Sequence, residues 1–246
     1  MNTKAVDTLP SHRILRRIMH GESDGPLLWW TSGVQHALIA GRITPLWNMQ
    51  VLSVGRIAST GEDQYEIHAY EVVLRTNART GEVLREWKNP FTGQACKVPI
   101  MRTKPDTQRY GRHGVEPGHR PGLILNHHYA LAPIGFDGSD IWLWADGRHR
   151  LTLPDGTERQ INELAIYSAT RSEVLDDAVR VPSGYVALHS ISAWYGWMGM
   201  AEGPAGSVMT RAFGRKATDL NVIPDELRRA LAAEAPDVLD NPMATL

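Results

Sequence analysis

The stretch from Tyr65 to Met101 decides the fold, and it reads YEIHAYEVVLRT, NARTG, EVLREWK, NPFTG and QACKVPIM. Its first twelve residues are rich in β-branched and aromatic side chains, which favour strands. Thr80-Gly81 and Thr92-Gly93 then repeat the same turn chemistry twelve residues apart, so 82–88 and 96–101 are expected to be strands. Short strands at this spacing predict antiparallel hairpins, because a parallel pair needs a long crossover connection.

A second block of expected strands follows further along the sequence. Its segments are 140–144, 148–153, 157–169 and 185–194, and Asp155-Gly156 is a strong hairpin signal between the second and third of them. The run from 105 to 121 has many Gly, Arg and His residues and no periodicity. We expect it to be a long surface loop or lid.

Helices are expected only near the two ends of the sequence. Residues 11–20 predict a short helix with an apolar face of Ile14, Leu15, Ile18 and Met19. Its basic face, made by Arg13, Arg16 and Arg17, is expected to be solvated. Residues 224–235 predict a second helix, which begins at Pro224 and stops at Pro236.

Residues 28–218 form a β-rich body between these helices, and no change of composition divides the chain. We therefore predict a single domain over residues 1–246. Its fold class is mainly β, an antiparallel curved sheet or barrel with a few peripheral helices. An unfilled barrel of this kind holds one small ligand among inward-facing side chains.

Composition excludes several classes of partner. The 26 basic and 27 acidic residues are spread along the chain and give a net charge of −1, without the basic face that nucleic-acid binding needs. No apolar run approaches a membrane span, and the N-terminal residues lack the apolar region of an export signal. Cys96 is the single cysteine, which rules out an internal disulfide. These features predict a cytoplasmic protein with neither nucleic-acid nor membrane partners.

Three stretches resemble a known family in sequence and in order. The first is 71–98, with TGE at 80–82 and WKNPFTG at 87–93; the second is NEL at 162–164 running into Tyr167; the third is WYGWMGM at 194–200, followed by GRK at 214–216. Together they resemble the bacterial and fungal family known as domain of unknown function 1838 (DUF1838), from about Leu28 to Pro242. The family tends to have Asp-Pro before the first Thr-Gly turn, where this chain has Asn77-Ala78-Arg79. The resemblance implies a fold unit and no particular reaction.

Motifs for cofactors and metals are missing from the sequence. It contains neither a phosphate-cradling glycine loop nor a Gly-x-Ser-x-Gly nucleophile elbow. His127 and His128 are adjacent, so on a strand they would point to opposite faces. No His-x-His or His-Glu-x-x-His spacing occurs, although a composite site built from distant histidines stays open. We predict a protein without cofactor or metal.

Acid–base chemistry without a cofactor is the class that remains. Glu163 and Tyr167 are four residues apart on an expected strand and therefore share a face. A carboxylate and a phenol on one face could move a proton if apolar surroundings raise the carboxyl pKa toward neutrality. The other candidate catalytic residues are His189, on the neighbouring strand, and His68 and Tyr70, which alternate with Glu66 along one face of an earlier strand.

Candidate substrate-binding residues come from two further groups. Trp194, Trp197 and Met198 supply apolar and aromatic surface, and Arg56 and Lys216 are basic groups for an oxyanion or carboxylate of the substrate. Each candidate also has a purely structural reading: a wet strand face for Glu163 and Tyr167, core packing for the tryptophans, an ordinary core or surface histidine for His189, a surface ion pair for Arg56, and a solvated Lys216.

We therefore expect a cofactor-independent enzyme of the lyase, isomerase or hydratase type. Its substrate would be a hydrophobic or aromatic small molecule bound in a β-barrel cavity. Two alternatives stay open: a non-catalytic carrier of a hydrophobic metabolite, and a subunit that docks another protein through an aromatic surface. The sequence leaves the oligomeric state open, including a homo-oligomer.

Overall fold

The computed structural model describes residues 11–23, 25–59, 61, 64–111, 114–115, 123–130, 139–152 and 158–246. Its strands are β1 (Leu27–Ile39), β2 (Arg42–Ser59), β3 (Tyr65–Thr76), β4 (Glu86–Lys88), β5 (Ala95–Lys97), β6 (Met101–Arg102), β7 (Asp106–Gly111), β8 (Gly114–Val115), β9 (Leu123–Ala130), β10 (Asp140–Thr152), β11 (Glu158–Thr170), β12 (Tyr185–Ser192) and β13 (Ser207–Ala217). The helices are α1 (Ser11–Met19), α2 (Arg171–Leu175), α3 (Asp225–Glu234) and α4 (Pro236–Asp240), with 3-10 turns η2 (Gly196–Met198), η3 (Leu220–Val222) and η4 (Pro242–Thr245).

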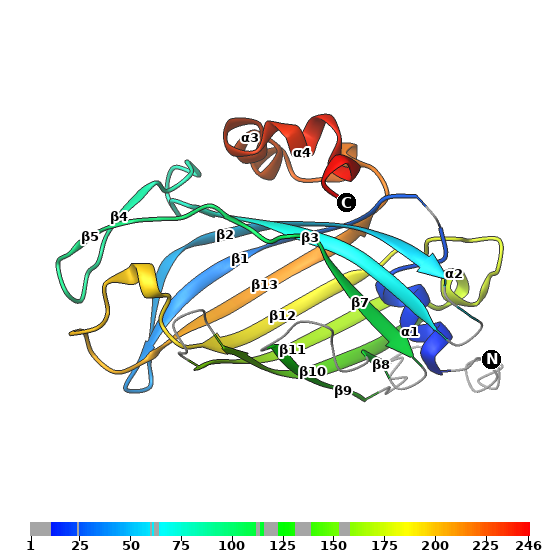
Figure 1. The fold of residues 1–246 in the computed structure, drawn as a ribbon, viewed down its shortest axis with the longest axis horizontal. Helices are drawn as coiled ribbons and strands as arrows, with labels where there is room; N and C mark the ends of the chain where they lie inside the picture. Colours follow the sequence, from blue (N-terminus) through cyan, green and yellow to red (C-terminus); the bar gives the residue numbers. More distant parts are fainter. Residues whose placement is uncertain are drawn as a thin grey trace.

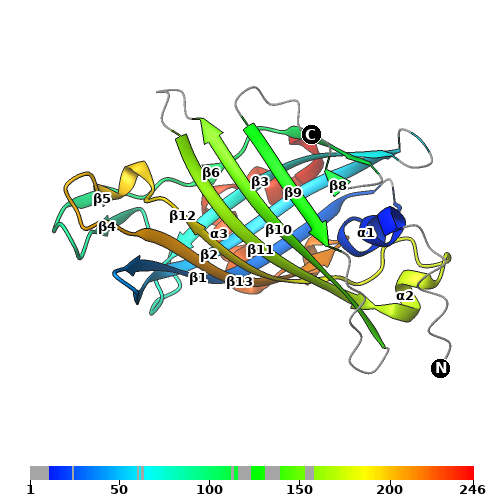
Figure 2. The same ribbon diagram turned by 90° about the horizontal axis from the view of Figure 1, so that it is seen from below.

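One large antiparallel sheet dominates these residues. Its strand order is β8-β7-β3-β2-β1-β13-β12-β11-β10-β9, with β6 paired to β3, and β4 and β5 form a separate hairpin. The sheet curves so strongly that β1, β2 and β3 lie opposite β10 and β11 (Figures 1 and 2). Within the described residues no ladder joins β9 to β8. The predicted curved antiparallel sheet is confirmed, and it is open rather than closed into a barrel.

The expected strands agree best with the structure where the strands are long. Strand β3 has the expected bounds, and β11 and β12 begin and end within two residues of them. The expectation of a surface loop over 105–121 is wrong at its start, because β7 and β8 lie there. Residues 112–113 and 116–121 of that run, including His113 and His119, lie outside the described residues.

The two Thr-Gly turns are built in the same way. The side-chain oxygen of Asn77 accepts from two backbone N–H groups of its turn, and that of Asn89 does the same in the second turn. Gly81 and Gly93 close the turns with φ angles of 72° and 74°, in the left-handed region that favours glycine. These turns fold the chain back between β3 and β5.

Two glycines on neighbouring strands allow the sharp curvature. A Cβ on Gly33 of β1 would lie 2.1 Å from the carbonyl oxygen of Arg211, and one on Gly214 of β13 would lie 2.1 Å from that of Trp30. Only residues without a side chain fit where the two backbones approach so closely. Both glycines lie on the β1–β13 ladder, within the curved part of the chain's large sheet.

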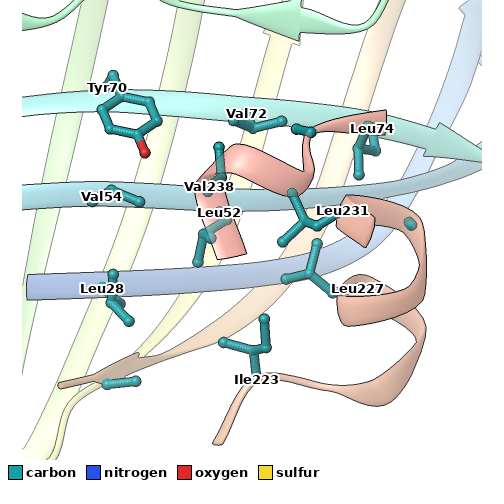
Figure 3. Packing of buried hydrophobic residues seen from close by; sticks show 13 residues of the cluster. Leu28, Leu52, Val54, Tyr70, Val72, Leu74, Ile223, Leu227, Leu231 and Val238 are labelled. Carbon is teal, nitrogen blue, oxygen red and sulfur yellow. The ribbon is translucent and has the colours of Figure 1, made fainter. Parts of the chain in front are cut away.

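One face of β1, β2 and β3, which we call the outer face, is covered by α3 and α4 (Figures 1 and 3). Alternate residues of each strand supply its aliphatic side chains, as expected for period-two strands. Helix α3 contributes Leu227 and Leu231, both fully buried. The cluster consists mainly of Leu28, Leu52, Val54, Tyr70, Val72, Leu74, Ile223, Leu227, Leu231 and Val238.

Helix α1 occupies one end of the curved sheet, beside α2 (Figure 1). Ile14, Leu15 and Ile18 are buried there, as the apolar face predicted. The expectation of a solvated basic face is wrong for Arg17, which is 0% exposed. Its guanidinium donates to the carbonyl oxygens of Glu173, Val174, Asp176 and Val179, at 2.6–3.0 Å, and pairs with Glu22. Arg17 thus binds α1 to the end of α2.

Candidate functional site

Glu163 and Tyr167 share one face of β11, on the side of the sheet that we call the inner face. Glu163 is opposite Ser190 of β12, and Tyr167 is opposite Leu143 of β10 and Val186 of β12. The Tyr167 ring meets the Trp29 ring of β1 edge-on, with centroids 5.7 Å apart. This contact joins the two halves of the curved sheet across its interior.

The Glu163 carboxyl has an altered acidity. Burial raises its pKa from 4.5 to about 7, and the negative charge of Glu71 adds to the rise. Burial also raises the pKa of the Tyr167 phenol, with Glu163 as the next cause. At neutral pH Glu163 therefore changes its protonation state readily, while Tyr167 keeps its proton and can donate a hydrogen bond.

Glu71 of β3 is a second inner-face carboxylate, which the sequence analysis did not single out. It accepts a 2.6 Å hydrogen bond from the Ser53 hydroxyl of β2. Ser53 is in turn opposite Trp29 in the ladder, so Glu71, Ser53 and Trp29 form one row across three strands. The sequence shows only that Glu71 and Tyr70 point to opposite faces of β3; the packing of Tyr70 in the outer-face cluster then places Glu71 on the inner face.

An aromatic cluster closes the inner face near α1. The rings of Tyr65 and Tyr110 are stacked, with centroids 5.0 Å apart, and His20 Nδ1 lies 3.1 Å from Tyr65 Oη. Burial, together with the charges of Lys216 and Arg16, lowers the pKa of His20 to about 3. His20 is therefore neutral at physiological pH, and its position in the core indicates a packing role.

Lys216 lies on the inner face but is engaged by α1. Its Nζ donates to the carbonyl oxygens of Arg17 and Ile18, at 2.8 and 2.7 Å, and it is 4% exposed. Burial lowers its pKa to about 7, with the charge of Arg17 as the next cause. The structural alternative of a solvated Lys216 is wrong. Its ammonium group is bound to the C-terminal end of α1 and is not directed at a position for a substrate anion.

Four other candidates lie on the opposite side of the sheet from Glu163. His189 is exposed on the outer face of β12, and Arg56 is exposed on the outer face of β2 beside His68. His68 Nδ1 lies 2.7 Å from the Thr107 hydroxyl, and the Tyr70 hydroxyl donates to the carbonyl oxygen of Pro242 at 2.8 Å. The structure does not bring these four residues together with Glu163 and Tyr167.

Comparison with known proteins bears on the first half of the chain. The model of a family described as "Protein of unknown function (DUF1838)" matches residues 24–119. Residues 24–119 are therefore similar to the DUF1838 family. The match confirms the family that the sequence motifs indicated, and it covers the first of the three motif stretches. A search of curated proteins gave no match.

The matched residues 24–119 contact the Trp-rich segment, residues 194–200, at the other end of the sheet, where β4, β5 and η2 lie together in Figure 1. Asn89 is 0% exposed, and its side-chain nitrogen donates to the carbonyl oxygen of Met198 at 2.7 Å. Trp197 packs against Trp47, and Trp194 against Phe91, within one cluster around buried Met198. The contact joins the first and third motif stretches in space.

This tryptophan cluster is separated from Glu163 along the sheet. Trp47 of β2 belongs to the cluster, and β1, β13 and β12 lie between it and β11. The residues between them in the same ladder row are Gln35, Thr210 and Ser190, with polar side chains. Core packing accounts for the contacts of Trp194, Trp197 and Met198 that the structure shows.

Arg75 is a buried cation at the Trp-rich end of the inner face. Its guanidinium lies over the rings of Tyr195 and Trp197, 4.8 and 5.3 Å from their centroids. It also donates to the side-chain oxygen of Gln35 and to the carbonyl oxygen of Pro99, both at 3.3 Å. These contacts fix Arg75 among neutral acceptors and aromatic faces.

No group of three or more His, Cys, Asp and Glu side chains in the described part of the chain is placed to hold a metal ion. His127 and His128 lie on β9, and their side chains are outside the described part. None of the helices that the structure describes is both long enough and apolar enough to cross a bilayer.

Proposed function

We propose that this protein is a cofactor-independent acid–base enzyme that acts on a hydrophobic small molecule bound at the inner face. The observation that carries the proposal is Glu163, a partly buried carboxyl with a pKa of about 7 beside Tyr167 and opposite Glu71. A general acid or base is most effective when its pKa lies near the working pH. Lyases, isomerases and hydratases of this type need one such group and no cofactor.

The neighbouring groups suggest a division of roles. Glu163 would remove a proton from carbon or return one, and the Tyr167 hydroxyl would donate a hydrogen bond to an oxygen that gains charge in the transition state. The Trp29 ring, which contacts Tyr167, would pack against the apolar body of the substrate. A cytoplasmic location, which the sequence predicts, is part of this proposal.

Proton exchange tests the proposal across many compounds at once. A panel of hydrophobic metabolites is incubated with the protein in D₂O, and ¹H NMR follows the loss of C–H signals as protons exchange with solvent deuterium. An enzyme that removes a proton from carbon is expected to accelerate this exchange for its substrate. Glu163→Gln should slow the exchange by about 100-fold or more, since general acid–base catalysis contributes 10²–10⁴-fold.

His189→Gln is the matched control, because His189 lies on the neighbouring strand and faces outward. It should exchange at the wild-type rate. Equal rates for the wild type and Glu163→Gln would show that Glu163 is not the acid–base group. Tight binding of a metabolite without any exchange would instead favour the carrier.

A further inference from the structure

We propose that the outer face of β12 and β13 binds a second copy of this chain, related to the first by a two-fold axis. The proposal is carried by exposed apolar residues on this face, by the arginines beside them, and by an acidic surface of the same chain that matches these arginines. It does not depend on the proposed site at Glu163, which lies on the inner face.

Helices α3 and α4 cover the outer face of β1, β2 and β3, whereas large apolar side chains on the outer face of β11, β12 and β13 are exposed. Phe213 of β13 is 66% exposed, more than any other large apolar residue in the described part of the chain, and Tyr185 and Leu164 are 47% and 40% exposed. Phe213 is opposite Ala187, which is two residues from Tyr185, and Leu164 is opposite His189. These residues form one patch across three strands, and exposed apolar patches of this kind mark interaction surfaces.

The rim of this patch is positively charged. Arg211 and Arg215 lie two residues before and after Phe213 on β13, so the three side chains share a face. Both arginines are exposed, and neither forms an ion pair with a described residue. The Arg215 guanidinium lies over the Tyr185 ring, 5.6 Å from its centroid. Strands β1, β12 and β13 contain no Asp or Glu, so carboxylates of a partner would complement these arginines.

A surface of the opposite charge follows in the same chain, around the start of α3. Asp219, Asp225 and Glu226 are exposed there, and none of them forms an ion pair with a described residue. Ile223, two residues before α3, belongs to the same buried cluster as Ala217 at the end of β13. The acidic surface therefore lies beside the end of the strand that carries the arginines.

A two-fold axis between these neighbouring surfaces uses each of them twice. The acidic start of α3 in one copy then faces Arg211 and Arg215 of the other copy, and the reverse contact is identical. The Phe213 rings lie between the two contacts, where they are removed from water. A polyanion such as a nucleic acid or an anionic membrane would also attract the arginines, but the acidic surface beside them would repel it. A second copy fits both surfaces.

The interface depends on charge as well as on apolar area. A standard interface buries about 800 Å² per partner, which is more than three half-exposed side chains supply. The ion pairs between the copies lie at the rim of the patch, where salt screens them. Association is therefore expected to weaken as the ionic strength rises.

Sedimentation velocity of the purified chain tests the proposal. The wild type should show a monomer–dimer equilibrium whose dissociation constant rises at least about threefold between about 0.05 and 0.5 M NaCl. Phe213→Ser should raise the dissociation constant by about tenfold or more, because it removes the most exposed apolar side chain of the patch.

Two double variants test whether the contact is between copies. Arg211→Glu/Arg215→Glu makes the basic rim acidic, and Asp225→Arg/Glu226→Arg makes the acidic surface basic. Each variant alone should be monomeric, because like charges then meet in both contacts. A mixture of the two variants should form a heterodimer, because opposite charges meet in both of its contacts.

Arg42→Glu/Lys88→Glu is the matched control, with the same change of charge at exposed positions at the start of β2 and on β4. It should associate like the wild type, and circular dichroism checks that each variant is folded. A wild type that is monomeric at about 0.1 mM, unchanged association of Phe213→Ser, or a mixture that stays monomeric would each overturn the proposal. Binding of polyuridylate or of anionic vesicles by a chain that does not self-associate would assign the face to a polyanion instead.

Discussion

The outer and inner faces of β1, β2 and β3 are built from alternate residues of the same strands, yet they differ in chemistry. The outer face presents Leu52, Val72 and Leu74 to α3 and α4, and the helices seal it (Figure 3). The inner face of the same strands presents Trp29 and Glu71, the latter exposed to solvent. The outer-face cluster under α3 and α4 excludes water, whereas the inner face combines buried apolar residues such as Ile67 and Val73 with an ionisable group, Glu71, that water reaches.

This difference separates stability from chemistry within single strands. An aliphatic face under a helix contributes free energy in proportion to the apolar area removed from water. A face with partly desolvated carboxyl groups gives up some of that stability, because burial of a charge is unfavourable. Substitutions on the outer face should therefore change the free energy of unfolding most, and those on the inner face should change its pH dependence.

The largest effect on stability is expected from Leu231→Ala in α3. Leu231 is fully buried in the outer-face cluster, so its truncation leaves a cavity and should lower the free energy of unfolding by about 3 kcal/mol. Urea unfolding followed by tryptophan fluorescence measures the change. Val222→Ala, at a site 51% exposed beside α3, should change it by less than about 0.5 kcal/mol. Equal effects of the two substitutions would contradict the assigned packing of α3.

A somewhat smaller loss is expected from Arg17→Met, which tests how α1 is held. The variant leaves four carbonyl oxygens, one of them buried and three partly buried, without their donor and should lose about 2 kcal/mol. Arg13→Met is the comparison, because Arg13 makes partly exposed ion pairs with Glu22 and Asp177, which contribute about 0–1 kcal/mol. A loss from Arg13→Met as large as that from Arg17→Met would show that surface ion pairs hold the helix.

The smallest effect is a change in pH dependence caused by Glu163→Gln. The folded-state pKa of Glu163 is raised to about 7, so the folded protein binds more protons than the unfolded chain between about pH 4.5 and 7. Wild-type stability should therefore fall through this window as pH rises, relative to the variant. From pH 4 to pH 8 the free energy of unfolding of Glu163→Gln should rise by about 1 kcal/mol relative to that of the wild type. A constant difference across the pH series would place Glu163 in a water-like environment.

The sequence predicted those features that depend on neighbouring residues along the chain. The β-branched and aromatic residues of 65–76, followed by turn residues, predicted the bounds of β3, and the four-residue spacing placed Glu163 and Tyr167 on one face. Which face turns inward is decided by long-range packing: both faces of β3 carry apolar residues, so His68 and Tyr70 were grouped with Glu163 although they point outward. Arg17 and Lys216 donate to carbonyl oxygens of segments that are distant in sequence. A local sequence pattern does not predict such partners.

The way α1 is fastened has a consequence for how this part of the chain can vary. Lys216 and Trp29 hold the last carbonyl oxygens of the helix, at Arg17, Ile18 and Met19, so they bind main-chain atoms that every residue type possesses. These contacts are therefore kept when a partly exposed side chain of the helix, such as Arg13, is replaced. An inserted residue in the helix would rotate all that precedes it by about 100°, turning its apolar side away from the sheet. The length of this helix is therefore constrained more tightly than the identity of its partly exposed residues.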